Sequence, residues 1–387
     1  MPSLPHHTDS LAQLEARIVE KIASNGAIPL SVYMKMALGD SEAGYYQVRD
    51  PFGRAGDFTT APEISGLFGE MCGLYLAYLA QAANASDMMV LELGPGRGSL
   101  MADMRNAWNT VMPDLAKAPI HLLETSPTLR QTQTAKLAGA KINFHSDLDA
   151  LPPVPLYAIA NEFFDALPID QLIWCPVSGA KTAGGQWHHR NVGLVNDRLQ
   201  FVIGAPVDVK TCKGYNLPDI APADPKTFPV AEICPQATTY MAKLAAHIAT
   251  HGGACLIIDY GRDGQTGDSL QAVANHQPVD VFYRPGAADL SHWVDFAALR
   301  RAAEAEGARL IGPEPQGRFL RRIGIMQRAE AAGRLADAAT RRDLHAAVDR
   351  LISTQHMGLL FKVALLIPAG AGLPEGFSTP ANEETGG

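Results

Sequence analysis

The stretch that most constrains the fold is 88–99, which reads MMVLELGPGRGS. Its first half is an apolar run with a single acid, Glu92, which is typical of a strand buried on both faces of a parallel sheet. Its second half contains three glycines and a serine suited to a helix N-cap, which are Gly94, Gly96, Gly98 and Ser99. The stretch predicts a strand, a tight glycine turn and a helix whose N-terminus offers N–H groups to a ligand.

The spacing of these glycines indicates which ligand the turn would bind. A dinucleotide fingerprint requires G-x-G-x-x-G, whereas this turn reads G-x-G-x-G with Glu92 two residues before its first glycine. A carboxylate at that position suits a ligand with a cationic end, and S-adenosylmethionine carries both an ammonium and a sulfonium group. The pattern E-x-G-x-G-x-G therefore favours S-adenosylmethionine as cofactor. The alternative is a structural turn that binds nothing.

Composition excludes several other classes of protein. The chain has 387 residues, 47% hydrophobic and 19% charged, with a net charge of −8 and a pI of about 5.8, so no general affinity for nucleic acid is expected. No apolar run is long enough to span a membrane, and the N-terminus resembles neither a signal nor a transit peptide. Five scattered cysteines without a C-x-x-C pair indicate reduced thiols and no metal site. We therefore expect a cytoplasmic protein.

A second and a third strand are predicted downstream. Residues 119–124 (PIHLLE) end in Glu124, where a Rossmann-like site holds two ribose hydroxyls through charge-assisted hydrogen bonds. Glu124 could instead be an acid at the start of the helix that Ser126 and Pro127 open. After residues 141–145 (KINFH), Asp147 could bond the adenine amino group or cap a turn.

Two further strands end in acids. Residues 156–160 (LYAIA) lead into NEFFDALP, which contains Asn161, Glu162 and Asp165, and residues 254–258 (ACLII) lead into Asp259. The carboxyl edge of an open α/β sheet is where such folds bind ligands. Carboxylates in a dry site hold a guanidinium well, and either acid after Asn161 could also be a base for an oxygen nucleophile. The alternative is a helix start with Asn161 or Asp165 as its cap.

The predicted fold class is α/β: a Rossmann-like sheet of the class I methyltransferase type, with a helical N-terminal extension and an antiparallel β insertion. We assign residues 1–84 to the extension, 85–168 and 236–367 to the core, 169–235 to the insertion and 368–387 to a flexible tail. The loop 39–66, long for a connection, could fold over the glycine turn as a lid or be an ordered surface loop.

Six motifs in this order suggest a family. They are GDFTTAPEIS (56–65), ELGPGRG (92–98), ETSP (124–127), NEFFDALP (161–168), DYG (259–261) and HMG (356–358). Together they resemble the MidA-like family of S-adenosylmethionine-dependent methyltransferases. Mitochondrial members of that family are complex I assembly factors that symmetrically dimethylate an arginine of a complex I subunit. The resemblance covers about residues 10–367.

The resemblance implies cofactor binding by Gly94, Gly96, Gly98 and Glu124. To these we add four residues at or just after the ends of the predicted strands, which are Glu92, Ser126, Asp147 and Asn161. A substrate arginine of a protein, expected to be a complex I subunit, would enter near the proposed catalytic acids, which are Glu162, Asp165 and Asp259. Because the chain lacks a mitochondrial presequence, it looks like a bacterial cytoplasmic member. The alternatives are a small-molecule O- or N-methyltransferase and an assembly chaperone that binds the cofactor without essential catalysis.

Overall fold

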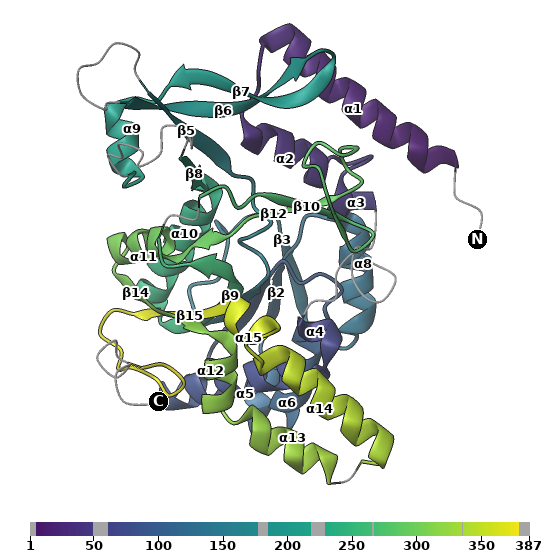
Figure 1. Cartoon of the computed structure of the whole chain (residues 1–387). Coiled ribbons are helices and arrows are strands. Elements are labelled where there is room, and N and C mark those ends of the chain that lie inside the picture. Colours follow the sequence, from purple (N-terminus) through teal and green to yellow (C-terminus); the bar gives the residue numbers. More distant parts are fainter. Residues whose placement is uncertain are drawn as a thin grey trace. The chain divides into compact units, whose positions relative to one another are not determined.

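The computed structural model (Figure 1) describes residues 5–48, 61–176, 185–217, 229–264, 267–334 and 336–378. The chain divides into two compact units of three segments each, and we describe each unit by itself. Unit 1 comprises Met1–Pro51, Ala166–Ala237 and Gly264–Ala298, and unit 2 comprises Phe52–Asp165, Thr238–Asp263 and Leu299–Gly387.

A mixed sheet forms the centre of unit 2. Its strands lie in the order β3, β2, β1, β4, β9, β15, β14. The first five are parallel to one another, whereas β15 is antiparallel to both of its neighbours. The strands are β1 (Met89–Leu93), β2 (Ile120–Leu123), β3 (Ile142–His145), β4 (Leu156–Asn161), β9 (Gly253–Arg262), β14 (Ala308–Pro315) and β15 (Phe361–Pro368). The five parallel strands are those that the apolar runs predict.

The strand order reverses at β1, which has β2 on one side and β4 on the other. The register places Leu93 beside Leu123 of β2 and beside Ala160 of β4. The residues that follow these three positions, Gly94, Glu124 and Asn161, therefore emerge side by side at the carboxyl edge. Such a reversal point is where open α/β sheets bind ligands.

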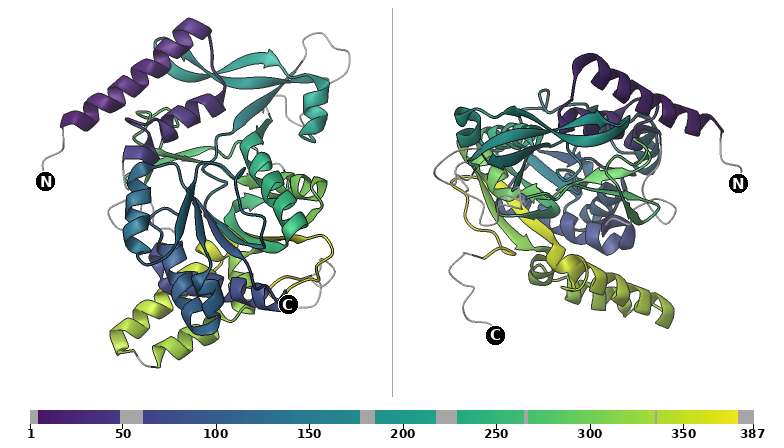
Figure 2. Two further views of the ribbon diagram at one scale, coloured as in Figure 1. Left: turned by 180° about the vertical axis from the view of Figure 1, so that it is seen from behind. Right: turned by 45° about the horizontal axis from the view of Figure 1, so that its top comes forward.

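Helices cover this sheet (Figure 2). Trp108 is buried between two of them, and its indole N–H donates to the carbonyl oxygen of Gly73 at 2.7 Å. A Cβ on Gly73 would lie 2.8 Å from the Cα of Met104, so only glycine allows this close approach of α5 to α6. The helices are α4 (Ala61–Ile64), α5 (Gly66–Ala82), α6 (Ser99–Val111), α7 (Pro113–Lys117), α8 (Pro127–Lys136), α10 (Pro235–His251), α11 (Phe296–Ala305), α12 (Gln316–Arg322), α13 (Ile325–Gly333), α14 (Ala338–Ile352) and α15 (Met357–Leu360); α10 and α11 begin in unit 1.

Unit 1 combines short helices with antiparallel strands. One sheet has the order β7, β6, β5, β8 and occupies the predicted insertion, and a second has the order β11, β10, β12. The helices are α1 (Pro5–Asn25), α2 (Leu30–Gly39), α3 (Tyr45–Val48) and α9 (Val209–Gly214). The strands are β5 (Asp170–Pro176), β6 (Gly185–Val195), β7 (Arg198–Pro206), β8 (Val230–Ile233), β10 (Gln271–Ala274), β11 (Gln277–Val279), β12 (Asp289–Ser291) and β13 (Val294–Asp295).

The units do not follow the predicted domain boundaries. The extension predicted as residues 1–84 divides between them, with α1 and α2 in unit 1 and α5 in unit 2. The reason is packing, because Leu14 and Ile18 of α1 share a core with Val192 of β6. In contrast, Phe68 of α5 belongs to the same core as Val90 of β1.

Two other segments differ from the expectations drawn from the sequence. Strand β14 was not predicted at all. Part of the predicted flexible tail packs on unit 2, where the ring of Phe377 is buried 5.3 Å from that of Phe319. Residues 379–387 of that tail lie outside the described residues.

The described part of the chain contains neither a membrane-spanning helix nor a metal-binding cluster. Within it, no helix combines the length and the apolar character needed to cross a bilayer. Nor do those residues place three or more His, Cys, Asp or Glu side chains where they could hold a metal ion.

Candidate functional site

The glycine turn after β1 requires the conformational freedom of glycine. Gly94, Gly96 and Gly98 have φ values of +63°, +50° and +76°, which side chains with a Cβ rarely adopt. A Cβ on Gly94 would also lie 2.9 Å from Cδ2 of Phe163. Helix α6 begins at Ser99 with Gly98 as its N-cap residue. The predicted N-cap role of Ser99 is therefore wrong, and its hydroxyl is available for other partners.

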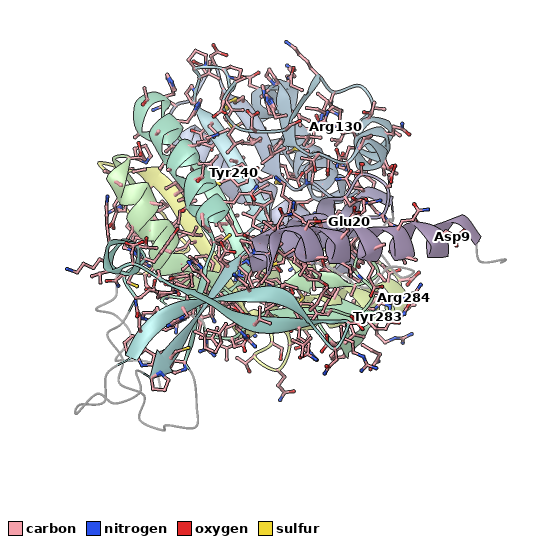
Figure 3. The ribbon with its side chains drawn as sticks, turned by 90° about the horizontal axis from the view of Figure 1, so that it is seen from above. Asp9, Glu20, Arg130, Tyr240, Tyr283 and Arg284 are labelled. Carbon is pink, nitrogen blue, oxygen red and sulfur yellow. The ribbon has the colours of Figure 1, made fainter. Side chains whose placement is uncertain are left out.

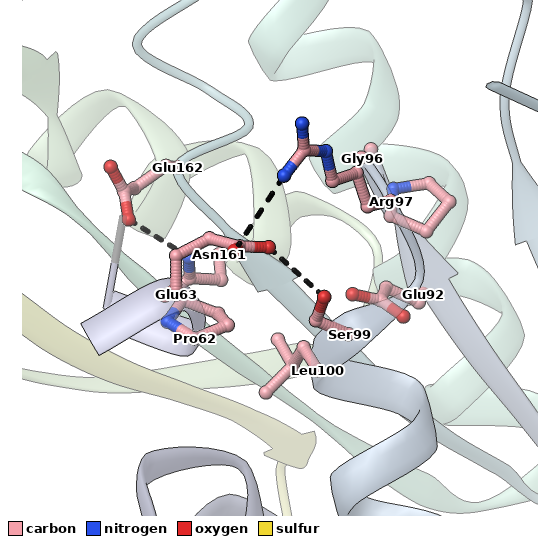
Figure 4. A pocket seen from close by; sticks show the side chains of 11 residues that line it. Pro62, Glu63, Glu92, Gly96, Arg97, Ser99, Leu100, Asn161 and Glu162 are labelled. Carbon is pink, nitrogen blue, oxygen red and sulfur yellow. Dashed lines mark hydrogen bonds and ion pairs between the residues drawn. The ribbon is translucent and has the colours of Figure 1, made fainter. Parts of the chain in front are cut away.

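A cavity of about 50 Å³ lies against this turn. Figure 4 shows that its walls come from the end of β1, the glycine turn, the start of α6, the end of β4 and the short helix α4. The volume holds a few water molecules, whereas pockets for small molecules usually have about 300–1,000 Å³. The lining residues are Pro62, Glu63, Glu92, Gly94, Pro95, Gly96, Arg97, Ser99, Leu100, Asn161 and Glu162.

Two of these residues direct unpaired hydrogen-bond acceptors at a buried position. Glu92 and Asn161 are 2% and 9% exposed, and neither Oε2 of Glu92 nor Oδ1 of Asn161 has a hydrogen-bond partner among the described residues. Burial raises the pKa of Glu92 well above its usual value, an effect opposed by the backbone amide of Met101 and increased by the charge of Glu124. A buried carboxylate oxygen without a partner is unfavourable, so this position is suited to a cation that donates hydrogen bonds.

Glu124 is buried beside the turn with both carboxylate oxygens oriented. Oε1 accepts from the backbone N–H of Ser126 at 2.8 Å, and Oε2 accepts from Nε2 of Gln133 at 3.0 Å. The same Gln133 nitrogen donates to the carbonyl oxygen of Gly96 at 2.7 Å. Burial raises the pKa of Glu124, although these donors oppose that shift. Ser126 acts as the N-cap of α8, where its Oγ accepts from Leu129 N–H.

Glu162 is the acid at the end of β4 that lines the cavity. Its φ of +51° is uncommon for a residue with a side chain, and such strained positions cluster at functional sites. Its Oε1 accepts from Nδ2 of Asn161 at 3.1 Å and from the backbone N–H of Ala61 at 3.4 Å. The second of these bonds ties α4 to the end of β4.

Asp259 is fully buried and faces backbone rather than the cavity. Its Oδ2 accepts from the backbone N–H groups of Phe163, Phe164 and Asp165 at 3.2, 2.9 and 3.3 Å, and its Oδ1 accepts from Tyr260 N–H at 2.9 Å. Burial raises its pKa, as does the charge of Glu162. Asp259 thus fixes the turn that follows Glu162.

Comparison with known proteins identifies the family. A family model described as "Putative S-adenosyl-L-methionine-dependent methyltransferase" matches residues 71–314. The mitochondrial protein arginine methyltransferase NDUFAF7 of Xenopus tropicalis is 32% identical over 393 residues, covering 94% of this chain and 88% of that protein. This chain belongs to the S-adenosylmethionine-dependent methyltransferases. The Homo sapiens protein of the same name is also 32% identical, and the match covers 91% of this chain and 82% of that protein.

A solved structure agrees with this assignment. The crystal structure of a "likely methyl transferase" from Burkholderia thailandensis, bound to S-adenosyl-homocysteine, matches this chain with a TM-score of 0.81 at 27% identity. The match covers 98% of this chain and 97% of that one. The predicted family, the Rossmann-like fold and the cofactor are confirmed.

The residues present fit this cofactor. The unpaired acceptors on Glu92 and Asn161 suit the ammonium group of its methionine, and the oriented carboxylate of Glu124 suits two ribose hydroxyls. The cavity therefore brings together several of the predicted site residues, which are Glu92, Gly94, Gly96, Asn161 and Glu162.

Other predicted site residues of the methyltransferase lie elsewhere. Gly98, Glu124, Ser126, Asp165 and Asp259 do not line the cavity. Asp147 is exposed, and its Oδ1 accepts from the backbone N–H of Asp149 at 2.9 Å, which is the turn cap that was the alternative for this residue. Residues 56–60 of the GDFTTAPEIS motif lie outside the described residues.

Sequence reasoning missed Gln133, Arg97 and Glu63. Gln133 gave no signal, since a glutamine within a polar helix is ordinary. Arg97 lies in the ELGPGRG motif and Glu63 in the GDFTTAPEIS motif. A charged residue in a Gly-rich turn or in a long loop is a signal from which both could have been predicted as site residues. Tyr240 on α10 (Figure 3) was also missed; its ring packs 5.5 Å from that of Phe163, beside the Asp259 turn.

Proposed function

We propose that this methyltransferase is a protein arginine N-methyltransferase. The observation that carries the proposal is Glu162, a strained acid in the wall of the cofactor-site cavity. The relatives named protein arginine methyltransferase, 32% identical over most of the chain, support it. The resemblance to the MidA-like family further suggests a complex I subunit as the acceptor.

The chain's own residues would act mainly by positioning. When bound, the cofactor supplies an activated methyl group on its sulfonium. Glu162 would receive the substrate guanidinium, since a carboxylate pairs with its planar donors and fixes one nitrogen toward the methyl group. Asp259 holds the Phe163–Asp165 turn through its backbone amides, and so keeps Glu162 at the cavity. We assign Asp259 a positioning role in this reaction, to which Asp165 contributes its backbone N–H.

The test is methyl transfer from tritiated S-adenosylmethionine to purified complex I subunits, followed by acid hydrolysis and identification of the labelled amino acid. We expect label in methylated arginine, and we expect Glu162→Gln to lower kcat/KM at least 100-fold while cofactor affinity changes less than threefold. Glu306→Gln, at an exposed position on the same unit, is the matched control. Full activity of Glu162→Gln would refute the assignment of this acid. Label found only in small metabolites would identify a small-molecule methyltransferase instead.

A further inference from the structure

The hydroxyl of Ser99 joins side chains from three elements. It donates to Oε1 of Glu63 on α4 at 3.0 Å and accepts from Nζ of Lys136 on α8 at 2.7 Å. The guanidinium of Arg97 in the glycine turn lies 3.9 Å from the other oxygen of Glu63. Figure 4 shows Glu63 reaching toward both Arg97 and Ser99 at the cavity. Glu63 is therefore held by one cation and one hydroxyl, and Lys136 is linked to it through that hydroxyl.

This arrangement is suited to bind a carboxylate from outside the chain as well. Arginine, lysine and hydroxyl groups donate strong hydrogen bonds to carboxylates. The site is at the first turn of α6, a 13-residue helix with no acid in that turn, and its dipole adds to the attraction. Glu63 is 20% exposed and Arg97 29% exposed, so water screens their interaction only partly.

The lining of the same cavity also has the complementary chemistry. Oε2 of Glu92 and Oδ1 of Asn161 are buried acceptors without a partner among the described residues. The cavity lining thus combines unpaired acceptors with the donors of Arg97 and Ser99. An amino acid with its α-ammonium and α-carboxylate groups has this polarity, and the methionine end of S-adenosylmethionine is such a group.

We propose that Arg97, Ser99 and Lys136 bind the α-carboxylate of the cofactor's methionine, and that Glu63 occupies this carboxylate site until the cofactor displaces it. The inference rests on the cofactor, which family membership establishes, and not on the identity of the methyl acceptor. Residues of this chain thereby compete with the ligand for one set of donors.

Displacement of Glu63 has a consequence at the end of β4. Because Glu63 is on α4, its displacement by the cofactor would remove the bond between Glu63 and Ser99 that holds α4 at the site. Besides Glu63, α4 is tied to the site through the bond between Ala61 N–H and Glu162, which at 3.4 Å is long for an N–H···O bond. Movement of α4 would lengthen this bond, whereas the bond from Nδ2 of Asn161 to the same oxygen of Glu162 would remain.

The experiment compares two ligands by titration calorimetry of the full chain: S-adenosylmethionine and decarboxylated S-adenosylmethionine, which lacks only the carboxylate. We expect Lys136→Met to weaken binding of the first about tenfold, as loss of one charge-assisted hydrogen bond implies, and to change binding of the second less than twofold. Lys141→Met, at an exposed position just past α8, is the matched control and should change neither. Melting temperatures of the variants check that each is folded.

Glu63→Gln tests the competition directly. Because the competing charge is lost, we expect S-adenosylmethionine to bind several-fold more tightly. If Glu63→Gln weakens the binding of both compounds, Glu63 itself binds the cofactor's ammonium group and the proposal is wrong. The proposal is also wrong if Lys136→Met weakens the binding of both compounds equally. The expected pattern together with no methylated arginine would leave this inference standing and refute the proposed function, so the two failures are distinguishable.

Discussion

The side-chain amide of Gln133 links the glycine turn to Glu124: its Nε2 lies 3.0 Å from the carboxylate and 2.7 Å from the carbonyl oxygen of Gly96. Gln133 is fully buried on α8. Two parts of the cofactor site that are nearly thirty residues apart in the sequence therefore depend on one side chain.

Replacing Gln133 should weaken cofactor binding through both of these partners. In Gln133→Leu, the carboxylate of Glu124 and the Gly96 carbonyl lose a donor, and hydrogen bonds to charged groups contribute about 1.5–3 kcal/mol. We expect the Kd for S-adenosylmethionine to rise at least tenfold by calorimetry. Gln131→Leu, exposed on the same helix, should leave it unchanged. Wild-type affinity in Gln133→Leu would show that Glu124 needs no such partner.

Glu92→Gln should raise the stability of the cofactor-free protein and weaken its binding of S-adenosylmethionine. Since burial raises the pKa of Glu92 in the folded protein, the cofactor-free protein loses stability as pH rises from the unfolded value near 4.5 through the raised folded pKa. The neutral variant avoids this loss. We expect a higher melting temperature than wild type at pH 8 without cofactor, and at least tenfold weaker S-adenosylmethionine binding.

The matched control for this prediction is Glu304→Gln, an exposed acid on α11 that should change neither quantity. A lower melting temperature for Glu92→Gln at pH 8 would contradict the interpretation of Glu92 as a buried carboxylate whose Oε2 has no partner.

Asp259→Asn should destabilise the fold rather than affect only catalysis. An amide nitrogen cannot accept a hydrogen bond, so one side of the new side chain faces backbone N–H groups that it cannot satisfy. We expect a loss of about 1–3 kcal/mol in the free energy of unfolding, measured with urea. Unchanged stability with abolished methyl transfer would instead favour a catalytic role for Asp259.

His121 should make the fold sensitive to acid. Its Nδ1 lies 2.7 Å from Nε2 of His145, and burial together with the charge of that neighbour lowers the pKa of His121 to about 4. The unfolded chain takes up this proton near pH 6.5, so stability is lost as pH falls from about 6.5 toward 4. From pH 7 to 5 we expect His121 to contribute a decrease of about 1–2 kcal/mol, measured as the difference between the wild-type and His121→Phe profiles.

The free energy of unfolding is measured with urea at each pH. The control is His345→Gln, at an exposed histidine on α14, which should keep the wild-type pH profile. An identical pH profile for wild type and His121→Phe would assign the acid sensitivity to other groups.

The sequence alone predicts the frame of this protein because that frame follows from local rules. Strands buried on both faces are apolar runs, so the sequence predicts β1 and β4. A turn with positive φ angles favours glycine, so the sequence also predicts the turn at 94–98. The parallel order brings the ends of these strands together. Hence the sequence by itself places Glu92, Asn161 and Glu162 at one edge of the sheet.

Tertiary structure decided what each polar side chain contacts. Asp259 and Glu162 both follow buried strands, yet the first is saturated by four backbone amides and the second lines the cavity. Glu63 meets Ser99 across 36 residues of sequence, and Gln133 meets Gly96 across 37. Hydrogen bonds between distant segments depend on how helices pack on the sheet, and no local pattern of residues specifies that packing.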